Sequence, residues 1–102
     1  MDDSVLTFEF DDESRTLFVT GSVDELSGVP LREAIGKYSD GHKEDLAVDL
    51  GEVDLLPSAG VGVLAVAMRQ AEENGATIEL VAKRDTIVQR VLNICGLPFR
   101  ER

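Results

Sequence analysis

The stretch VDLLPSAGVGVLAVAMRQ, residues 53–70, decides the fold of this chain of 102 residues. It passes from one apolar run, through a proline, a serine and two glycines, into a second apolar run. The pattern from Val61 to Asn74 is apolar almost all round for two turns, which predicts a helix that other elements cover on several sides. We therefore expect this helix to begin at Gly60, near the centre of the fold, with Ser58 at or just outside its N-terminus.

The segments on both sides of this helix have the patterns of strands. LAVDL, residues 46–50, predicts a short buried strand, and TIELVA, residues 77–82, predicts the next strand, with Ile78 and Leu80 pointing inward. Residues 46–81 thus form a strand, helix, strand unit, whose crossover connection places the two strands parallel.

The N-terminal part of the chain predicts a hairpin followed by a helix. VLTFEF (5–10) and TLFVTGSV (16–23) alternate apolar and polar residues, and the polar turn DDESR joins them. Ser27 is the expected N-cap of a helix that ends by Gly41. The apolar face of this helix is formed by Leu31, Ala34, Ile35 and Tyr38.

A last helix is predicted near the C-terminus. Asp85 or Thr86 is the expected N-cap, with Gln89 as the capping-box partner, and Gly96 followed by a leucine is typical of a Schellman stop. Cys95 continues the apolar stripe of this helix, so we expect a buried, inert thiol. PFRER, residues 98–102, is too short to assign.

The resulting order of elements, ββαβαβα, predicts an α/β fold. We expect one domain over residues 1–102, with a core over about 5–97, in which a small mixed β-sheet of about four to five strands is packed against helices.

Charge and composition exclude several classes of function. The chain carries 20 acidic and 10 Lys and Arg side chains, and residues 1–50 hold 13 of the acids but only 4 of the bases. No basic surface is available for nucleic acid or an anionic membrane, and no apolar run approaches a membrane span. The N-terminus lacks the pattern of a secretory signal, so we expect a cytoplasmic protein. The acidic half either maintains solubility or faces a basic protein partner.

Motifs for catalysis, cofactors and metals do not fit this chain. GVGVLA, residues 60–65, matches a loose dinucleotide loop, but its first glycine lies ten positions after the expected strand end at Leu50. LPSAG lacks the first glycine of a nucleophile elbow, and His42, its one candidate base, is expected to be solvated in a loop. The carboxylates of Asp49, Glu52 and Asp54 are expected at the surface, with a magnesium site as the alternative. We expect no catalytic residue, no cofactor and no metal.

Ser58 then has two interpretations. Its hydroxyl is either an N-cap, which contributes about 1 kcal/mol to stability, or an exposed phosphorylation site. A phosphate would add about −1.5 to −2 charges at the positive end of the helix dipole, which the fold tolerates and a partner surface does not.

The segment DLGEVDLLPSAGVGVLAVAMRQAEENGATIELV, followed by VQRVLNICGL, resembles the STAS domain of anti-sigma factor antagonists. In that family a strand leads into a D-S-[ST]-G-like turn, a G-x-x-x-L helix, a strand, and a last helix ending in -GL. GSVDELS, residues 21–27, resembles the G-x-x-D segment of the family. The resemblance runs from about Leu6 to Leu97.

The resemblance implies a protein switch without enzymatic activity. Unphosphorylated members bind an anti-sigma factor, often a serine kinase of the histidine-kinase-like ATPase type, and so release the sigma factor. The kinase phosphorylates the serine of the turn, and a PP2C-type phosphatase restores it. By this resemblance Ser58 is the phosphoacceptor, Gly60 is the turn glycine, and Asp24 lies beside Ser58 at a partner surface that also includes Pro57 and Ala59.

Two residues depart from the family pattern. Pro57 stands where the family usually has Asp, and Ala59 replaces the usual Ser or Thr. Proline removes a carboxylate and a backbone donor. The alternative is therefore a constitutive STAS interaction module without phosphorylation, such as a subunit of a lipid-transport ATPase or a signalling scaffold. A small-ligand sensor and an independent enzyme rank below both.

Overall fold

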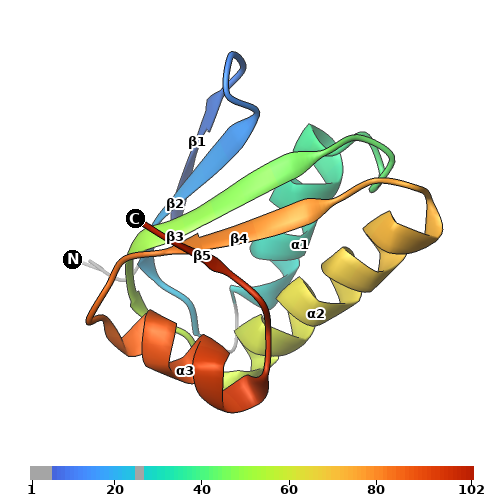
Figure 1. Cartoon of the computed structure of the whole chain (residues 1–102). Helices are drawn as coiled ribbons and strands as arrows, with labels where there is room; N and C mark the ends of the chain where they lie inside the picture. Colours follow the sequence, from blue (N-terminus) through green and yellow to red (C-terminus); the bar gives the residue numbers. More distant parts are fainter. Residues whose placement is uncertain (1–5, 25–26) are drawn as a thin grey trace.

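A five-stranded sheet with helices on one face forms the protein (Figure 1). The structure is a computed structural model that describes residues 6–24 and 27–102. The strand order is β1-β2-β3-β4-β5, in sequence order. The elements are β1 (Thr7–Asp11), β2 (Thr16–Ser22), α1 (Gly28–Tyr38), β3 (Leu46–Leu55), α2 (Ser58–Glu73), β4 (Ile78–Ala82), α3 (Ile87–Cys95) and β5 (Arg100–Glu101). The predicted α/β class and the mixed sheet are confirmed.

The first two strands form the predicted antiparallel hairpin, and the remaining strand pairs are parallel. Leu46 of β3 lies opposite Ile78 of β4, so the predicted crossover unit is confirmed. The fifth strand comes from the segment that was too short to assign: residues 100 and 101 pair with Val81 and Ala82 at the end of β4. Residues 1–5, 25 and 26, which include parts of the predicted first strand and of GSVDELS, lie outside the described residues.

β3 is longer than the predicted strand, which ended at Leu50. Its second half continues to Leu55 because it pairs with the end of β2, where Thr20 lies opposite Glu52 and Ser22 lies opposite Leu55. The acidic residues in this half interrupt the apolar pattern, so the sequence does not indicate that the strand continues. Because of this extension, β3 ends only three residues before Ser58.

The core lies between one face of the sheet and the helices. Leu17 and Val19, two apolar residues of the alternating pattern in β2, are buried there. Most of the remaining core comes from the inward side chains of β3 and β4 and from the buried faces of the three helices: Leu46, Val48, Leu50, Ile78, Leu80, Leu31, Ile35, Leu64, Ala67, Ala71, Val88 and Leu92. Buried aliphatic side chains each contribute about 1.5–3 kcal/mol, so this layer is the main source of stability.

α2 is less covered than its composition predicts. It packs against α1 and β4, but Gly62 faces solvent and Val66 is 40% exposed. In Figure 1, α1 and α2 lie side by side on the sheet, so neither covers the outer side of the other. The helix is thus covered on the sides that face α1 and β4, as expected, and is open on its outer side.

The ends of α1 and α3 follow the predicted signals with one exception. The Thr86 hydroxyl accepts the Gln89 N–H, and Gly96 has φ 74° while the Leu97 N–H donates to the Leu92 carbonyl, as in a Schellman stop. Ser27 is at the N-cap of α1 but its side chain makes no cap hydrogen bond. Instead its hydroxyl donates to Asp24 Oδ1 at 2.8 Å.

Two side chains lie elsewhere than the sequence predicts. Cys95 is exposed, because it falls in the last turn of α3, beyond Leu92, the last side chain of the helix that reaches the core. Asp49 is buried at 4% exposure instead of lying at the surface. Its carboxylate accepts the Gly51 N–H at 2.8 Å and the Arg102 Nε–H at 2.7 Å, which satisfies the buried charge.

Candidate functional site

The turn between β3 and α2 places Ser58 at the surface. Leu56 is buried and anchors the turn, while Pro57 occupies the N-cap position with φ −76° and ψ 171°. Ser58 is the first residue of α2, and the first helical hydrogen bond runs from the Val61 N–H to the Pro57 carbonyl at 3.1 Å. α2 therefore begins two residues earlier than predicted, because proline at the N-cap needs no N–H and leads directly into the helix.

The Ser58 hydroxyl does not cap the helix. Pro57 holds the cap position, and its ring has no group that can accept a backbone N–H. Ser58 is exposed, and its hydroxyl makes no hydrogen bond with any residue that the structure describes. The capping interpretation is therefore wrong for Ser58, and its hydroxyl is accessible to a second protein.

The helix terminus supplies a positive electrostatic environment at Ser58. The backbone N–H groups of Ser58, Ala59 and Gly60 precede the first hydrogen bond of α2, so they have no acceptor within the helix. Together with the helix dipole, these donors favour a negative group at this point. A phosphate on Ser58 would lie beside them.

Gly60 brings the turn against the segment that follows β2. A Cβ at this position would lie 2.8 Å from Leu56 Cδ1 and 2.9 Å from Val23 Cγ1, both closer than normal packing allows. The Val23 N–H also donates to the Leu55 carbonyl at 3.1 Å. Val23 precedes Asp24, so the structure brings the two predicted partner-binding segments, around residues 24 and 57–60, to the same end of the sheet.

Asp24 is held in place by the start of α1. Its carboxylate accepts the Ser27 hydroxyl, and its carbonyl accepts the Ser27 N–H at 3.1 Å. The residue is half-buried. Two contacts with Ser27 thus tie Asp24 to the start of α1.

A groove between α1 and α2 starts at Ala59, next to Ser58. Its volume is about 460 Å³, and its apolar lining includes Gly62, Val63 and Val66. The side chains of Arg32 and His42 border it, and its lining within residues 6–24 and 27–102 includes no carboxylate. His42 is half-buried here, although the sequence predicted a solvated side chain. Sequence reasoning missed this groove because it depends on how two helices pack.

The acidic side chains near the end of β3 do not form a metal centre. Arg102 forms ion pairs with the carboxylates of Asp49 and Glu52. Lys83 forms a second ion pair with Glu52, at 3.0 Å. The hydrogen bond from Lys83 and its charge lower the pKa of Glu52. Within residues 6–24 and 27–102, no group of three His, Cys, Asp or Glu side chains is arranged to hold a metal ion.

Comparison with known proteins assigns the fold. Residues 6–98 match the family described as "Mlab, STAS domain". The chain belongs to the STAS domain family. The expected resemblance is thus confirmed over all of the residues from which it was inferred, about Leu6 to Leu97.

The relatives of this STAS domain have names that refer to one function. The anti-sigma-F factor antagonist RsfB of Mycobacterium tuberculosis (strain CDC 1551 / Oshkosh) is 29% identical over 82 residues, which are 79% of this chain and 65% of that protein. The anti-sigma-B factor antagonist of Listeria monocytogenes is 28% identical over 97 residues, 95% of this chain and 84% of that protein. The chain thus spans less than two thirds of the length of RsfB.

A solved structure supports the same fold. The crystal structure of an anti-sigma factor antagonist from Mycobacterium paratuberculosis superposes with a TM-score of 0.80 at 22% identity, covering 97% of this chain and 88% of that one. None of the helices in the described part of the STAS domain is long and apolar enough to cross a bilayer.

Proposed function

We propose that this STAS domain is an anti-sigma factor antagonist whose binding is switched by phosphorylation of Ser58. The exposed Ser58 hydroxyl at the first position of α2, free of hydrogen bonds to the described residues, is the observation that carries the proposal. In the unmodified state the domain binds an anti-sigma factor and so releases a sigma factor. The domain itself is a regulator and not an enzyme, and it acts in the cytoplasm.

The partner surface of this proposal is formed by two segments. Pro57, Ser58, Ala59 and Gly60 form the turn, and Asp24 lies in the neighbouring segment, held by Ser27. The anti-sigma factor is a serine kinase of the histidine-kinase-like ATPase type, and a PP2C-type phosphatase reverses the modification. Because the phosphate adds about two negative charges beside the free N–H groups of α2, the fold accepts it while the interface loses a neutral hydroxyl.

A modification experiment tests the phosphorylation. The protein is purified from its own cells, and its intact mass is measured before and after treatment with a PP2C-type phosphatase. We expect a fraction heavier by one phosphoryl group, absent from Ser58→Ala and retained in Ser14→Ala, which removes an exposed serine distant in sequence. A phosphorylated fraction that persists in Ser58→Ala would contradict the assignment.

A binding experiment tests the switch. Ser58→Asp should weaken binding to the anti-sigma factor by about 100-fold, since charge inserted at a desolvated interface costs a few kcal/mol. Ser58→Ala should bind almost as well as the wild type, because it keeps the surface neutral. Equal affinity of the Asp and Ala variants, measured by calorimetry, is the result that contradicts a switch at this residue.

Pro57 favours a second candidate function, a constitutive interaction module that uses the same surface without modification. Proline in place of the usual Asp removes the carboxylate that would directly precede Ser58 in the chain. In that case the wild-type protein should carry no phosphate in its own cells and should co-purify with a transporter ATPase or a signalling scaffold instead of an ATPase-fold kinase.

A further inference from the structure

The groove between α1 and α2 runs along about three turns of α2. The α2 residues that line it recur at helical spacing, on one side of the helix: Ala59, Gly62, Val63, Val66, Ala67 and Gln70. At 1.5 Å per residue, this side extends over about 16 Å. Most of these residues are exposed or half-buried, so a second protein can reach them.

Gly62 keeps the middle of this groove open. A Cβ at Gly62 would have no neighbour within 4 Å, so no contact inside the described part of the protein requires a glycine there. Glycine within a helix costs about 0.5–1 kcal/mol relative to alanine. The missing side chain thus leaves space above α2 without improving the packing of the fold. Small residues of this kind allow a second helix to approach closely, because the side chains at a contact set the distance between two helices.

The groove has two distinct ends. Near the start of both helices, a Cβ at Gly28 would lie 3.7 Å from Val63 Cγ2. Near their other ends, the side-chain N–H of Asn74 donates to the His42 carbonyl at 3.0 Å. α1 and α2 therefore run in the same direction, side by side (Figure 1), and the groove leads from the turn at Ser58 toward His42.

Hydrogen bonds fix the loop that carries His42. The His42 N–H donates to the hydroxyl of the buried Ser39 at 3.0 Å, and that hydroxyl donates to the Ile35 carbonyl at 2.6 Å. His42 has φ 69°, in the left-handed region, which histidine adopts more readily than most residues. Its imidazole borders the groove, where a ring N–H can donate to an oxygen of a bound segment in either protonation state.

Arg32 gives the groove a positive charge. It borders the groove from α1, it is exposed, and it makes no ion pair or side-chain hydrogen bond with a described residue. Over the described ranges, 6–24 and 27–102, no carboxylate lines the groove. In a chain with 20 acidic side chains and 10 Lys and Arg side chains, this groove is a local surface of the opposite charge.

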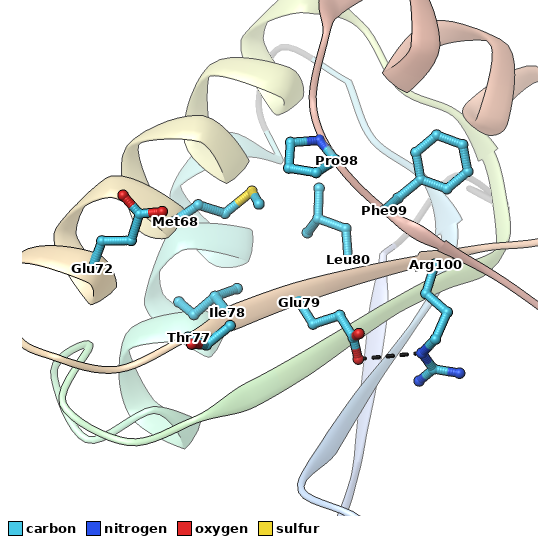
Figure 2. A pocket seen from close by; sticks show the side chains of 9 residues that line it. All are labelled: Met68, Glu72, Thr77, Ile78, Glu79, Leu80, Pro98, Phe99 and Arg100. Atoms are coloured by element: carbon cyan, nitrogen blue, oxygen red, sulfur yellow. Dashed lines mark ion pairs between the residues drawn. The ribbon is translucent and has the colours of Figure 1, made fainter.

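A second hollow beside α2 has a different charge (Figure 2). Its volume is about 310 Å³, and it lies between α2, β4 and residues 98–100. Met68 and Glu72 border it from α2. Arg100, at its other side, pairs with Glu79 at 3.3 Å. A negatively charged segment is therefore favoured in the groove and disfavoured in this hollow.

We propose that the groove between α1 and α2 binds an acidic amphipathic helix of a partner protein. The apolar side chains of this helix pack on Gly62 and Val66, as in other helix-in-groove complexes. Its carboxylates bind Arg32 and His42. A second copy of this chain is a poor occupant, because each copy has a net charge of −10. The contact does not require phosphorylation of Ser58, so it is tested separately from the proposed switch.

Titration with a capped peptide, EEALEALLEELAEAL, whose leucines form one face of a helix, tests the proposal. The amide signals of the full-length ¹⁵N-labelled protein are followed by NMR, and we expect the largest shifts at Gly62 and its neighbours in α2. Arg32→Glu should weaken binding about tenfold, the size expected when an exposed ion pair is reversed. Arg90→Glu makes the same charge change at an exposed position of α3 outside the groove, and we expect it to change affinity much less.

A second variant tests the shape of the groove. The added side chain of Gly62→Leu fills the groove, so it should weaken peptide binding about tenfold or more. The fold should tolerate it, because the space above Gly62 is open and leucine is the better helix former. Urea unfolding checks that stability is retained. Asn93→Leu adds the same side chain at an exposed position of α3 and should leave the affinity unchanged.

Two further peptides separate the proposed contact from attraction by overall charge. In the first, lysine replaces every glutamate: the net charge of the protein favours this peptide, whereas the groove favours the acidic one, which we expect to bind more tightly. In the second, proline replaces the central alanine at the sixth position of the acidic peptide, which interrupts the helix and should remove most of the affinity.

Four results would each overturn the proposal. They are tighter binding of the lysine peptide, equal binding of the proline peptide, equal effects of Arg32→Glu and Arg90→Glu, and the absence of shifts near Gly62. Unchanged affinity in Gly62→Leu would do the same. Concentration-dependent shifts of the Gly62 signal without peptide, with a dimer mass in ultracentrifugation, would assign the groove to a second copy and also overturn it.

Discussion

Gly60 connects the site to the core at the scale of single atoms. The two atoms that a Cβ would meet belong to Leu56 and Val23, both of which are buried and enclosed by other core residues. Val23 is branched at Cβ and cannot move its methyl group aside without rotating the whole side chain. The glycine thus sets how closely α2 approaches the segment that carries Asp24.

Gly60→Ala should therefore destabilise the protein by about 1–3 kcal/mol, the usual cost of overpacking. Gly62→Ala is the matched control in the same helix, because its Cβ would have no neighbour within 4 Å. It should stabilise by about 0.5–1 kcal/mol, because alanine is the better helix former. Urea unfolding measures both free energies, and an equal effect of the two substitutions would contradict close packing at Gly60.

Asp11 offers a residue-scale test of electrostatics in the hairpin turn. The Ser14 hydroxyl and the Ser14 N–H both donate to Asp11 Oδ2, the former at 2.5 Å and the latter at 3.2 Å. The hydroxyl hydrogen bond is the main cause of a lowered pKa of Asp11, relative to its ordinary value of 3.8.

Ser14→Ala should raise the pKa of Asp11 toward 3.8, and NMR titration of the side-chain carboxyl measures it. Because the folded pKa lies below the unfolded one, the contribution of Asp11 to stability is present above the unfolded pKa and is lost as the pH falls through the folded pKa. The variant should therefore lose less stability on acidification than the wild type. An unchanged pKa in the variant would show that another group holds it low.

At the scale of elements, the two helix starts of α1 and α3 differ in how they use a hydroxyl. Thr86 accepts the Gln89 N–H, and the Gln89 side chain accepts the Asp85 N–H at 2.9 Å, so this helix start is satisfied locally. Ser27 gives its hydroxyl to Asp24 instead. The start of α1 thus orients a candidate partner-binding carboxylate.

Thr86→Ala should cost about 1 kcal/mol of stability, the usual value of an N-cap. Thr86→Ser keeps the acceptor oxygen and should retain most of it. The melting temperature measures both, and a Ser variant as unstable as the Ala variant would indicate that the methyl group matters more than the cap.

At the scale of the whole molecule, the local patterns of the sequence were sufficient for most elements but not for contacts between distant residues. The alternation around Phe8 and Val19 and the stop at Gly96 depend on neighbours in the chain, so they could be predicted. Asp49 meets Arg102 across 53 positions, and no local pattern indicates that pair or the burial it permits. Likewise, the sequence alone did not decide whether the Ser58 hydroxyl caps α2 or is exposed, and the structure decides this by placing Pro57 at the cap position.

The Asp49–Arg102 pair connects the middle of the sheet to the last strand. Asp49 is buried, whereas the Arg102 side chain is 36% exposed and lies over Gly51, where a Cβ would collide with its guanidinium. The carboxylate of Asp49 raises the pKa of Arg102, mainly through their hydrogen bond. Removing the arginine leaves a buried carboxylate whose remaining hydrogen bond with a described residue is the one from the Gly51 N–H. Breaking a pair by removing one partner is costly, because the other charge stays buried without compensation.

Arg102→Gln should therefore destabilise the protein by about 1–3 kcal/mol, less than a fully buried pair because solvent screens the exposed guanidinium. Asp49→Asn should recover part of this loss in the double variant, since it removes the unpaired charge, and the two substitutions should be coupled by about 1–2 kcal/mol in a double-mutant cycle. Arg84→Gln is the control, because it removes an exposed ion pair between Arg84 and Glu101 of β5. It should cost under about 1 kcal/mol. Additive effects of the two substitutions in urea unfolding would show that β5 is held by its backbone alone. Coupling would show that the buried carboxylate of Asp49 in β3 also holds β5 in place.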